Sequence, residues 1–520
     1  MRTALYTISA GISLLLGMSL LQPACSAEAT DAESQDQEVS NHGLGVPLPA
    51  VARSGSVIKF HGNSSRDGFY VDPTLTPANL ATLHRDATFN GAVTGAVYAQ
   101  PLYVENGPNA REAFIVATEE NHVTALDSAG NVIWDQTFGS PARSGLPCGN
   151  IRPLGITGTP VIDEASRTIY FDAMTSPNGT SGFKHLIHAI SLDDGTEKAG
   201  WPLDFSNIVT GASSPHHNQR GALDLVNGIL YIPYGGHFGD CDPYRGTVVG
   251  IPVNNPAGAK YWATAGQEGG IWSTGGTASD GVSIYAATGN TTGASSWAGG
   301  EAIVKLKAGP TFSSQPADFF APTDWKELDN GDVDLGGSNP VLIDMPGAPV
   351  PRLVLAFGKD ANLYIGNRDD LGGIGGAKSR TKVASGAILG ASASYKTSQG
   401  TYVALRAAYG HGNGCPIGGR GNIAVTKIIP ENPPRAQVVW CTDEKLGSPI
   451  ASSVDGTSKA ILWDASDKLY AYDGDTGEKL FAGGAPTDAL GATMQYFNSP
   501  IIAKGRVVVP TNGKLVVFKP

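Results

Sequence analysis

A short strand pattern recurs along most of the chain. It joins a small residue and a proline to a run of apolar residues, as in TGTPVID and NSPIIAK, and its prolines are Pro101, Pro160, Pro340, Pro449 and Pro500. Weaker copies at 221–225, 275–278 and 391–394 fill the gaps, so that seven intervals between Pro101 and Pro500 average 57 residues. A repeat of about 50 residues made of four short strands is typical of one β-propeller blade.

The remainder of each repeat fits this interpretation. The segments HVTALDSAGNVIWDQ (122–136) and KLYAYDGDTGEKLF (468–481) alternate apolar residues on both sides of a turn that contains Asp and Gly. Glycine, with 68 of 520 residues, is about twice its usual share of ~7%, as many tight turns require. We therefore predict an all-β fold, an eight-bladed β-propeller of four-stranded antiparallel blades.

The last repeat is incomplete. Residues 492–520 supply about three strands, so we expect the segment around 84–90 to add the fourth strand and close the ring. Two alternatives remain open. A seven-bladed ring results if the weak repeats at 388–443 and 492–520 are miscounted, and strand spacing alone does not exclude two unrelated β-sandwich domains.

The N-terminus predicts export. Arg2 precedes an apolar run at 8–21 that is too short to span a membrane, and Cys25 and Ala27 are small residues before a cleavage point. We therefore predict a signal peptide over 1–27, with a lipid anchor at Cys25 as the alternative. Residues 28–50 predict a polar, acidic linker, and 51–520 form the propeller. The protein is expected in the periplasm, on the outer membrane as a lipoprotein, or secreted.

The net charge and the cysteines further restrict the class of protein. Lys and Arg number 36 and Asp and Glu 47, a net charge of −11, which argues against a general nucleic-acid binder. Besides Cys25 the chain has Cys148, Cys241, Cys415 and Cys441. An even number of cysteines in an exported chain predicts disulfides. The sequence contains no CxxCH motif, so we expect no covalently bound haem.

Long polar loops are predicted on one face of the ring. In a four-stranded blade, the turn between the second and third strands and the link to the next blade emerge on the same side. The segments at these places are long and polar: CGNIRPLG (148–155), SSPHHNQRG (213–221), YGGHFGDCDPYRG (234–246), ATGNTTGASSW (287–297), PTDWKELDNGDVDLGG (322–337), FGKDANLY (357–364) and YGHGNGCPIGGRG (409–421). Loops held by a rigid scaffold often carry function.

One of these regions resembles a known family. The segment GGIWSTGGTASDGVSIYAATGN (269–290) resembles the part of the quinoprotein alcohol dehydrogenases that carries the pyrroloquinoline quinone (PQQ) platform. The resemblance covers roughly residues 55–520 and extends to repeats such as YAYDGDTGEKLF. It implies a PQQ cofactor, a calcium-type ion, and oxidation of an alcohol.

The resemblance also implies roles for particular residues. Trp272 would stack under the flat quinone, and Asn290 would bind the calcium ion. Asp332 or Asp334, in the next blade link, would accept the proton of the alcohol as the catalytic base. Lys359 would contact the quinone oxygens and stabilise the charge of the reduced cofactor.

The chain departs from the family at two points. His237 stands where the family has its calcium-binding Glu, with Asp240 and Asp242 nearby as substitutes, so the implied metal ligands are Asn290, Asp332, His237, Asp240 and Asp242. Many members have two adjacent cysteines over the quinone, whereas this chain has only Cys148 at that junction. We favour the pairs 148–241 and 415–441, although four cysteines allow three pairings.

We expect a monomer. The sequence leaves three candidate functions. The first is an exported dehydrogenase that oxidises an alcohol or a sugar or polymer hydroxyl and passes electrons to a separate acceptor. The second is a non-catalytic envelope propeller of the outer-membrane assembly type. The third is a hydrolase or lyase that uses the His/Asp cluster at 216–242. Other candidate groups are a metal site made by His216, His217 and His237, and the carboxylates Glu119 and Glu120.

Overall fold

A computed structural model describes residues 48, 55–406, 415, 422–442 and 447–520. These residues belong to one compact unit, Gly45–Pro520. None of their helices has the length and apolar character needed to cross a membrane. The predicted signal peptide with Cys25, and the predicted linker apart from Leu48, lie outside the described residues.

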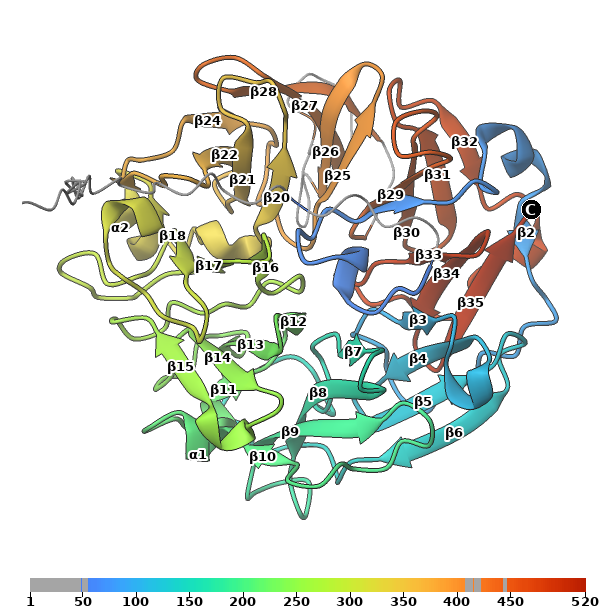
Figure 1. Cartoon of the computed structure of the whole chain (residues 1–520), viewed down its shortest axis with the longest axis horizontal. Helices are drawn as coiled ribbons and strands as arrows, with labels where there is room; N and C mark the ends of the chain where they lie inside the picture. The colour runs from blue at the N-terminus through green and yellow to red at the C-terminus, as the bar shows by residue number, and fades with distance from the viewer. Residues whose placement is uncertain (1–47, 49–54, 407–414, 416–421, 443–446) are drawn as a thin grey trace, which may run out of the picture. The chain divides into compact units, whose positions relative to one another are not determined.

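Eight sheets stand around a central axis, each with four main antiparallel strands, which confirms the predicted eight-bladed propeller (Figure 1). Blades one and two contain β3 (Leu102–Val104), β4 (Ala113–Ala117), β5 (His122–Leu126), β6 (Val132–Thr137), β7 (Val161–Asp163), β8 (Thr168–Thr175), β9 (Lys184–Ser191) and β10 (Leu203–Asp204). Blades three and four contain β12 (Asp224–Val226), β13 (Ile229–Gly236), β14 (Thr247–Pro252), β15 (Lys260–Ala263), β16 (Ala278–Ser279), β17 (Ile284–Thr288), β18 (Ala302–Leu306) and β19 (Phe319–Ala321).

The second half of the ring repeats this plan. Blades five and six contain β20 (Val341–Asp344), β21 (Arg352–Phe357), β22 (Asn362–Asn367), β24 (Ser379–Lys382), β25 (Ala393–Thr397), β26 (Gly400–Arg406), β27 (Ile423–Ile429) and β28 (Arg435–Cys441). Blades seven and eight contain β29 (Ile450–Ser453), β30 (Ile461–Ala465), β31 (Leu469–Asp473), β32 (Lys479–Ala482), β33 (Ile501–Ala503), β34 (Arg506–Thr511), β35 (Lys514–Lys519) and β2 (His84–Arg85).

Short elements decorate the blades. Three strands add to sheet edges: β1 (Phe69–Val71), β11 (His217–Asn218) and β23 (Gly373–Ile374). The described helices are α1 (Phe205–Ile208), α2 (Trp325–Asn330) and the 3₁₀ turns η1 (Phe60–Gly62), η2 (Pro77–Thr82), η3 (Pro108–Ala110), η4 (Ser214–His216), η5 (Pro256–Gly258), η6 (Pro316–Asp318), η7 (Leu335–Gly337) and η8 (Pro486–Asp488).

The core lies between neighbouring sheets. All five residues of β4 (AFIVA) are apolar and buried. Ile115 of β4 and Ala125 of β5 share one apolar cluster with Ile169 and Phe171 of the next blade. Because each sheet is covered on both faces, the sequences of its middle strands are continuous apolar runs and do not alternate between apolar and polar residues.

The ring closes where the sequence predicts. Strand β2 pairs antiparallel with β35, with His84 opposite Lys519 and Arg85 opposite Phe518. The N-terminal strand therefore completes blade eight, and the ring has no open edge between its first and last repeats.

An axial segment, residues 57–72, crosses the inside of the ring, a feature that no pattern in the sequence predicted (Figure 1). It makes hydrogen bonds to every blade in turn. The partners, from blade one to blade eight, are Tyr103, Ile162, Leu225, Ser279, Leu342, Ser394, Ala451 and Gly505. The segment thus satisfies backbone groups on the inner edges of the blades, which would otherwise be unpaired.

Arg66 anchors this axial segment. Its fully buried guanidinium donates to the carbonyl oxygens of Thr277, Phe60 and Leu223 at 2.8, 3.1 and 3.0 Å. It also lies 3.9 Å from the buried carboxylate of Asp224.

Replacing this guanidinium by an apolar side chain leaves those buried acceptors unpaired. We expect Arg66→Met to lower the free energy of unfolding by about 3 kcal/mol, measured as a lower urea midpoint. The matched control is Arg435→Met, because the ion pair of Arg435 with Glu431 is about half exposed on both sides and is worth about 0.5 kcal/mol. Equal midpoints for the two variants would show that the axial segment does not stabilise the ring.

Candidate active site at the mouth of the ring

The links between blades surround a cavity of about 420 Å³ at one end of the axis. The volume is in the range of small-molecule sites. The links contribute Asn150, Arg220, Trp272, Asp334, Leu389 and Phe497 to its walls. The cavity is also lined by Asn290, Asp332, Lys359, His237 and Asp240. Every predicted site residue except Asp242 therefore lies on this one cavity, while Asp242 is exposed and outside it.

A second cavity, of about 330 Å³, lies on the other side of Tyr244. It contains none of the predicted quinone-site residues, although His217 lines it.

Two glycines leave the space that the Trp272 indole and its neighbours occupy. A Cβ atom at Gly289 would lie 2.6 Å from Asp334 Oδ1 and 3.3 Å from Trp272 Nε1, and one at Gly337 would lie 2.7 Å from a backbone oxygen and 3.7 Å from the indole. A side chain at 289 would therefore displace both the carboxylate and the ring. The glycine of the TGN motif is needed because the backbone approaches both groups closely.

Asp334 links the other members of the site. Its Oδ2 atom lies 2.6 Å from Lys359 Nζ, and its Oδ1 accepts the backbone N–H of Asn290 at 2.9 Å. The side chain of Asp334 is 4% exposed, whereas that of Asp332 is 68% exposed although it also contacts Lys359, at 2.7 Å. Of the two predicted bases, Asp334 is the buried one.

Lys359 is a cation that two aspartates hold beside the indole of Trp272. Its Nζ lies 5.6 Å from the centre of the Trp272 ring, a cation–π distance. Burial by itself lowers the pKa of Lys359, but the charges of Asp334 and Asp332 and their hydrogen bonds outweigh it, so the net shift is upward. Lys359 therefore remains protonated at neutral pH.

Glu268 is a further carboxylate beside Asn290, and it was not among the predicted site residues. Its Oε2 accepts from Asn290 Nδ2 at 3.0 Å, and Asn290 Nδ2 also contacts Thr292 Oγ1 at 2.8 Å. Burial raises the pKa of Glu268 and outweighs the hydrogen bond from Thr292, which lowers it. The negative charge of Asp240 raises the pKa further. Glu268 is four residues before Trp272, in the same blade link, so its position in the chain was an available signal.

Two of the predicted metal ligands, His237 and Asp240, are engaged with protein groups. His237 Nε2 contacts the carbonyl oxygen of Pro215 at 3.1 Å, and burial lowers its pKa to about 4. Asp240 accepts from the hydroxyl of Tyr244 at 2.6 Å. Within the described ranges, no three or more His, Cys, Asp or Glu side chains are placed to hold a metal ion. The donor set as arranged does not fit the calcium site that the family resemblance implied, and we derive no step from a metal.

Of the alternative candidate groups, His237 lines the cavity, whereas His216, His217, Glu119 and Glu120 lie outside it. His216 Nδ1 contacts the hydroxyl of Ser213, and His217 Nδ1 contacts the carbonyl of the same residue. Glu119 is buried and accepts from the backbone N–H of Gly155 and the hydroxyl of Thr157. Glu120 forms an ion pair with Arg143.

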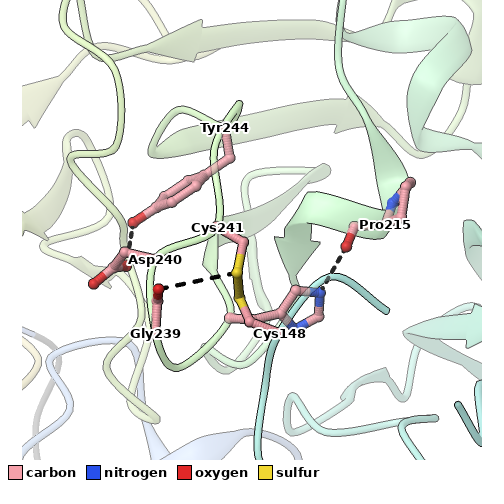
Figure 2. Close-up of a disulfide and its surroundings, with 7 residues drawn as sticks. Cys148, Pro215, Gly239, Asp240, Cys241 and Tyr244 are labelled. Carbon is pink, nitrogen blue, oxygen red and sulfur yellow. Dashed lines mark hydrogen bonds between the residues drawn. A yellow bond between two sulfur atoms is a disulfide. The ribbon is translucent and has the colours of Figure 1, made fainter. Parts of the chain in front are cut away.

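Both favoured disulfides are present. Cys148–Cys241 joins the link between blades one and two to the loop between β13 and β14, and Figure 2 shows Asp240 and Tyr244 beside it. Backbone N–H of Gly149 donates to Phe238 O at 3.1 Å, which fixes the same two loops to each other. Cys415–Cys441 joins β28 to the chain that follows β26.

Glu301 holds the backbone next to Asp334. It is fully buried, and its Oε2 accepts the backbone N–H of Leu335, the residue after Asp334, at 2.6 Å. Burial, and then the charge of Asp334, raises the pKa of Glu301 to about 9. Glu301 is therefore neutral at pH 7 and adds no second charge beside Asp334.

This shift makes stability depend on pH. The folded chain holds the Glu301 proton more tightly than the unfolded chain, so its contribution is complete below pH 4.5 and disappears as pH rises toward 9. We expect Glu301→Gln, which cannot ionise, to lose less stability than wild type between pH 6 and pH 9, by up to about 1.4 kcal/mol per pH unit. Urea unfolding at the two pH values measures this, and parallel profiles would contradict it.

Solved structures share this fold. No protein-family model and no curated protein matches the chain. Quinohaemoprotein alcohol dehydrogenase from Comamonas testosteroni matches 90% of this chain and 80% of its own, with 15% identity and a TM-score of 0.62. The enzyme ADHIIG from Pseudomonas putida HK5 matches 89% and 80%, with 14% identity and a TM-score of 0.63. A europium-containing methanol dehydrogenase matches 90% and 98%, with 13% identity and a TM-score of 0.60. At these identities the likeness establishes a shared fold and no more.

Proposed function

We propose that the chain is a quinoprotein-type dehydrogenase that oxidises an alcohol with PQQ bound in the cavity at the mouth of the ring. One observation carries the proposal: a single cavity gathers an indole, a buried carboxylate, a held lysine and an asparagine in the order along the chain that the family resemblance implied. The fold shared with alcohol and methanol dehydrogenases supports it.

The residues present fit a flat, anionic quinone. The indole of Trp272 offers a broad aromatic surface, and the glycine cradle at 289 and 337 leaves room at its edge. Arg220 and Lys359 line the same cavity and supply positive charge for quinone carboxylates and oxygens.

When bound, PQQ would supply the acceptor for a hydride, one proton with two electrons, from the carbinol carbon of the substrate. Asp334 would take the hydroxyl proton, since each carboxylate oxygen keeps a free lone pair beside its present hydrogen bond. Lys359 would hold Asp334 in place and stabilise the negative charge that develops nearby. Asn290 fixes the other oxygen of Asp334 through its backbone N–H.

Electrons would then pass to a separate acceptor, because the sequence carries no haem-attachment motif. The N-terminal sequence and the two disulfides support an exported, extracytoplasmic protein.

Reconstitution tests the proposal. The purified full chain is incubated with PQQ, alone or with Ca²⁺ or Eu³⁺, and reduction of a redox dye is followed with a panel of primary and secondary alcohols. Dye reduction that requires both the quinone and an alcohol is expected. Absence of turnover in every arm would contradict the proposal and favour the non-catalytic propeller.

A further inference from the structure

The cavity at the mouth of the ring is lined by two chemically different groups of residues. Asp332, Asp334 and Lys359 are charged, while Phe238, Ala387, Leu389 and Phe497 are apolar residues of the same lining. The described function uses the charged residues and the indole, and it assigns no role to the apolar residues.

Phe238 is unusually exposed for an aromatic residue. With 67% of its surface exposed, it is the most exposed of the six large apolar side chains that are exposed in the described residues. It is nevertheless held firmly, because its carbonyl oxygen accepts from Gly149 N–H and Cys241, three residues on, is bonded to Cys148. Phe238 is therefore an exposed aromatic side chain on a fixed loop, and it lines the cavity.

Phe497 is the second fixed aromatic ring. The guanidinium groups of Arg220 and Arg406 lie 5.2 and 5.8 Å from its ring centre. Tyr496 meets it edge to face at 5.2 Å, and Arg406 in turn lies 3.3 Å from the centre of the Tyr496 ring. These contacts restrain Phe497 while it lines the cavity.

We propose that Phe238 and Phe497 form a subsite for an aromatic ring on the substrate, so that the substrate class is a benzyl-type alcohol rather than a short-chain alcohol or a free sugar. This inference rests on the proposed function. The aromatic ring of the substrate packs against these two side chains, and its hydroxyl reaches toward Asp334. Aromatic pairs contribute beyond the area they bury, whereas a sugar would place several hydroxyls against apolar surface without partners.

Binding to the quinone-free full chain tests the subsite without any redox step. The probes are benzyl alcohol, ethanol and glucose, each titrated by ligand-observed NMR. Wild type is expected to bind benzyl alcohol more tightly than the other two, and Phe238→Ala to weaken benzyl alcohol binding about fivefold to tenfold. The matched control is Val282→Ala, which removes a side chain that is 58% exposed and is not part of the cavity lining, and its binding should equal that of wild type.

Failure of this inference is distinguishable from failure of the proposed function. Benzyl alcohol binding that depends on Phe238, without turnover in the quinone-loaded protein, supports the subsite and contradicts the dehydrogenase. Turnover with kcat/KM higher for ethanol or glucose than for benzyl alcohol supports the dehydrogenase and overturns the subsite. Unchanged benzyl alcohol binding in Phe238→Ala also overturns it.

Discussion

Asp334→Asn is expected to lower kcat for alcohol oxidation by about 10²- to 10⁴-fold, which is the usual contribution of a positioned general base. Asparagine keeps the shape of the side chain and can still accept from Asn290 N–H, but it cannot accept a proton from the substrate. Affinity for the quinone should change little, because the indole and Lys359 remain. Steady-state kinetics of the reconstituted protein, with quinone affinity measured in parallel, give both quantities.

Asp332→Asn is the matched control for this prediction. The two aspartates share Lys359, but the side chain of Asp332 is 68% exposed and that of Asp334 is 4% exposed. We expect Asp332→Asn to retain activity within about threefold, as for a surface ion pair worth less than 1 kcal/mol. If Asp332→Asn were the inactive variant and Asp334→Asn the active one, the base would be assigned to the wrong residue.

Trp272→Ala is expected to weaken PQQ binding by about 2 kcal/mol, or about 30-fold in Kd, because the quinone loses one aromatic contact face. Trp272→Phe, which keeps a smaller ring, should lose less. Isothermal titration of the three proteins with PQQ measures the effect.

Trp297→Ala is the control for a lost indole. The indole of Trp297 stacks on Phe319 at 4.1 Å, in the apolar core of blade four and outside the cavity lining. Its removal should reduce stability and leave the quinone affinity unchanged. Equal affinities of Trp272→Ala and wild type would show that the cofactor does not lie against Trp272.

The blades were predictable because they repeat. Five repeats begin with a small residue and a proline, and weaker copies at 221–225, 275–278 and 391–394 mark the others. The individual blades are therefore visible in the sequence, and their spacing predicts the ring. The closing strand was also predictable, since the last repeat lacks a strand and 84–90 precedes the first complete one.

The axial segment was not predictable from the same signals. Its residues KFHGNSSRDG have no strand or helix periodicity, and they read as a polar loop. Most of their bonds to the blades join backbone groups, as between Ala451 N–H and the carbonyl of Gly68, and a contact made by any backbone N–H or carbonyl leaves no side-chain signature.

The site residues were predictable where their order along the chain determines their position, and not where the conformation of a loop determines it. Trp272 lies in a link between blades, and Asn290 and Lys359 come directly after the ends of β17 and β21, so the ring brings them to one mouth. Asp332 and Asp334 are two residues apart in an irregular link, and only the structure shows that Asp332 has φ 51° and an exposed side chain. Asp242 was placed in the metal set by proximity in sequence, but the loop turns it away from the cavity.

A crystal structure of the full chain grown with PQQ tests the central claim most directly. The account predicts density for one flat molecule in the cavity at the mouth of the ring, lying against the indole of Trp272 with Lys359 at its edge. An empty cavity at saturating PQQ, or PQQ bound at another place on the ring, would contradict it.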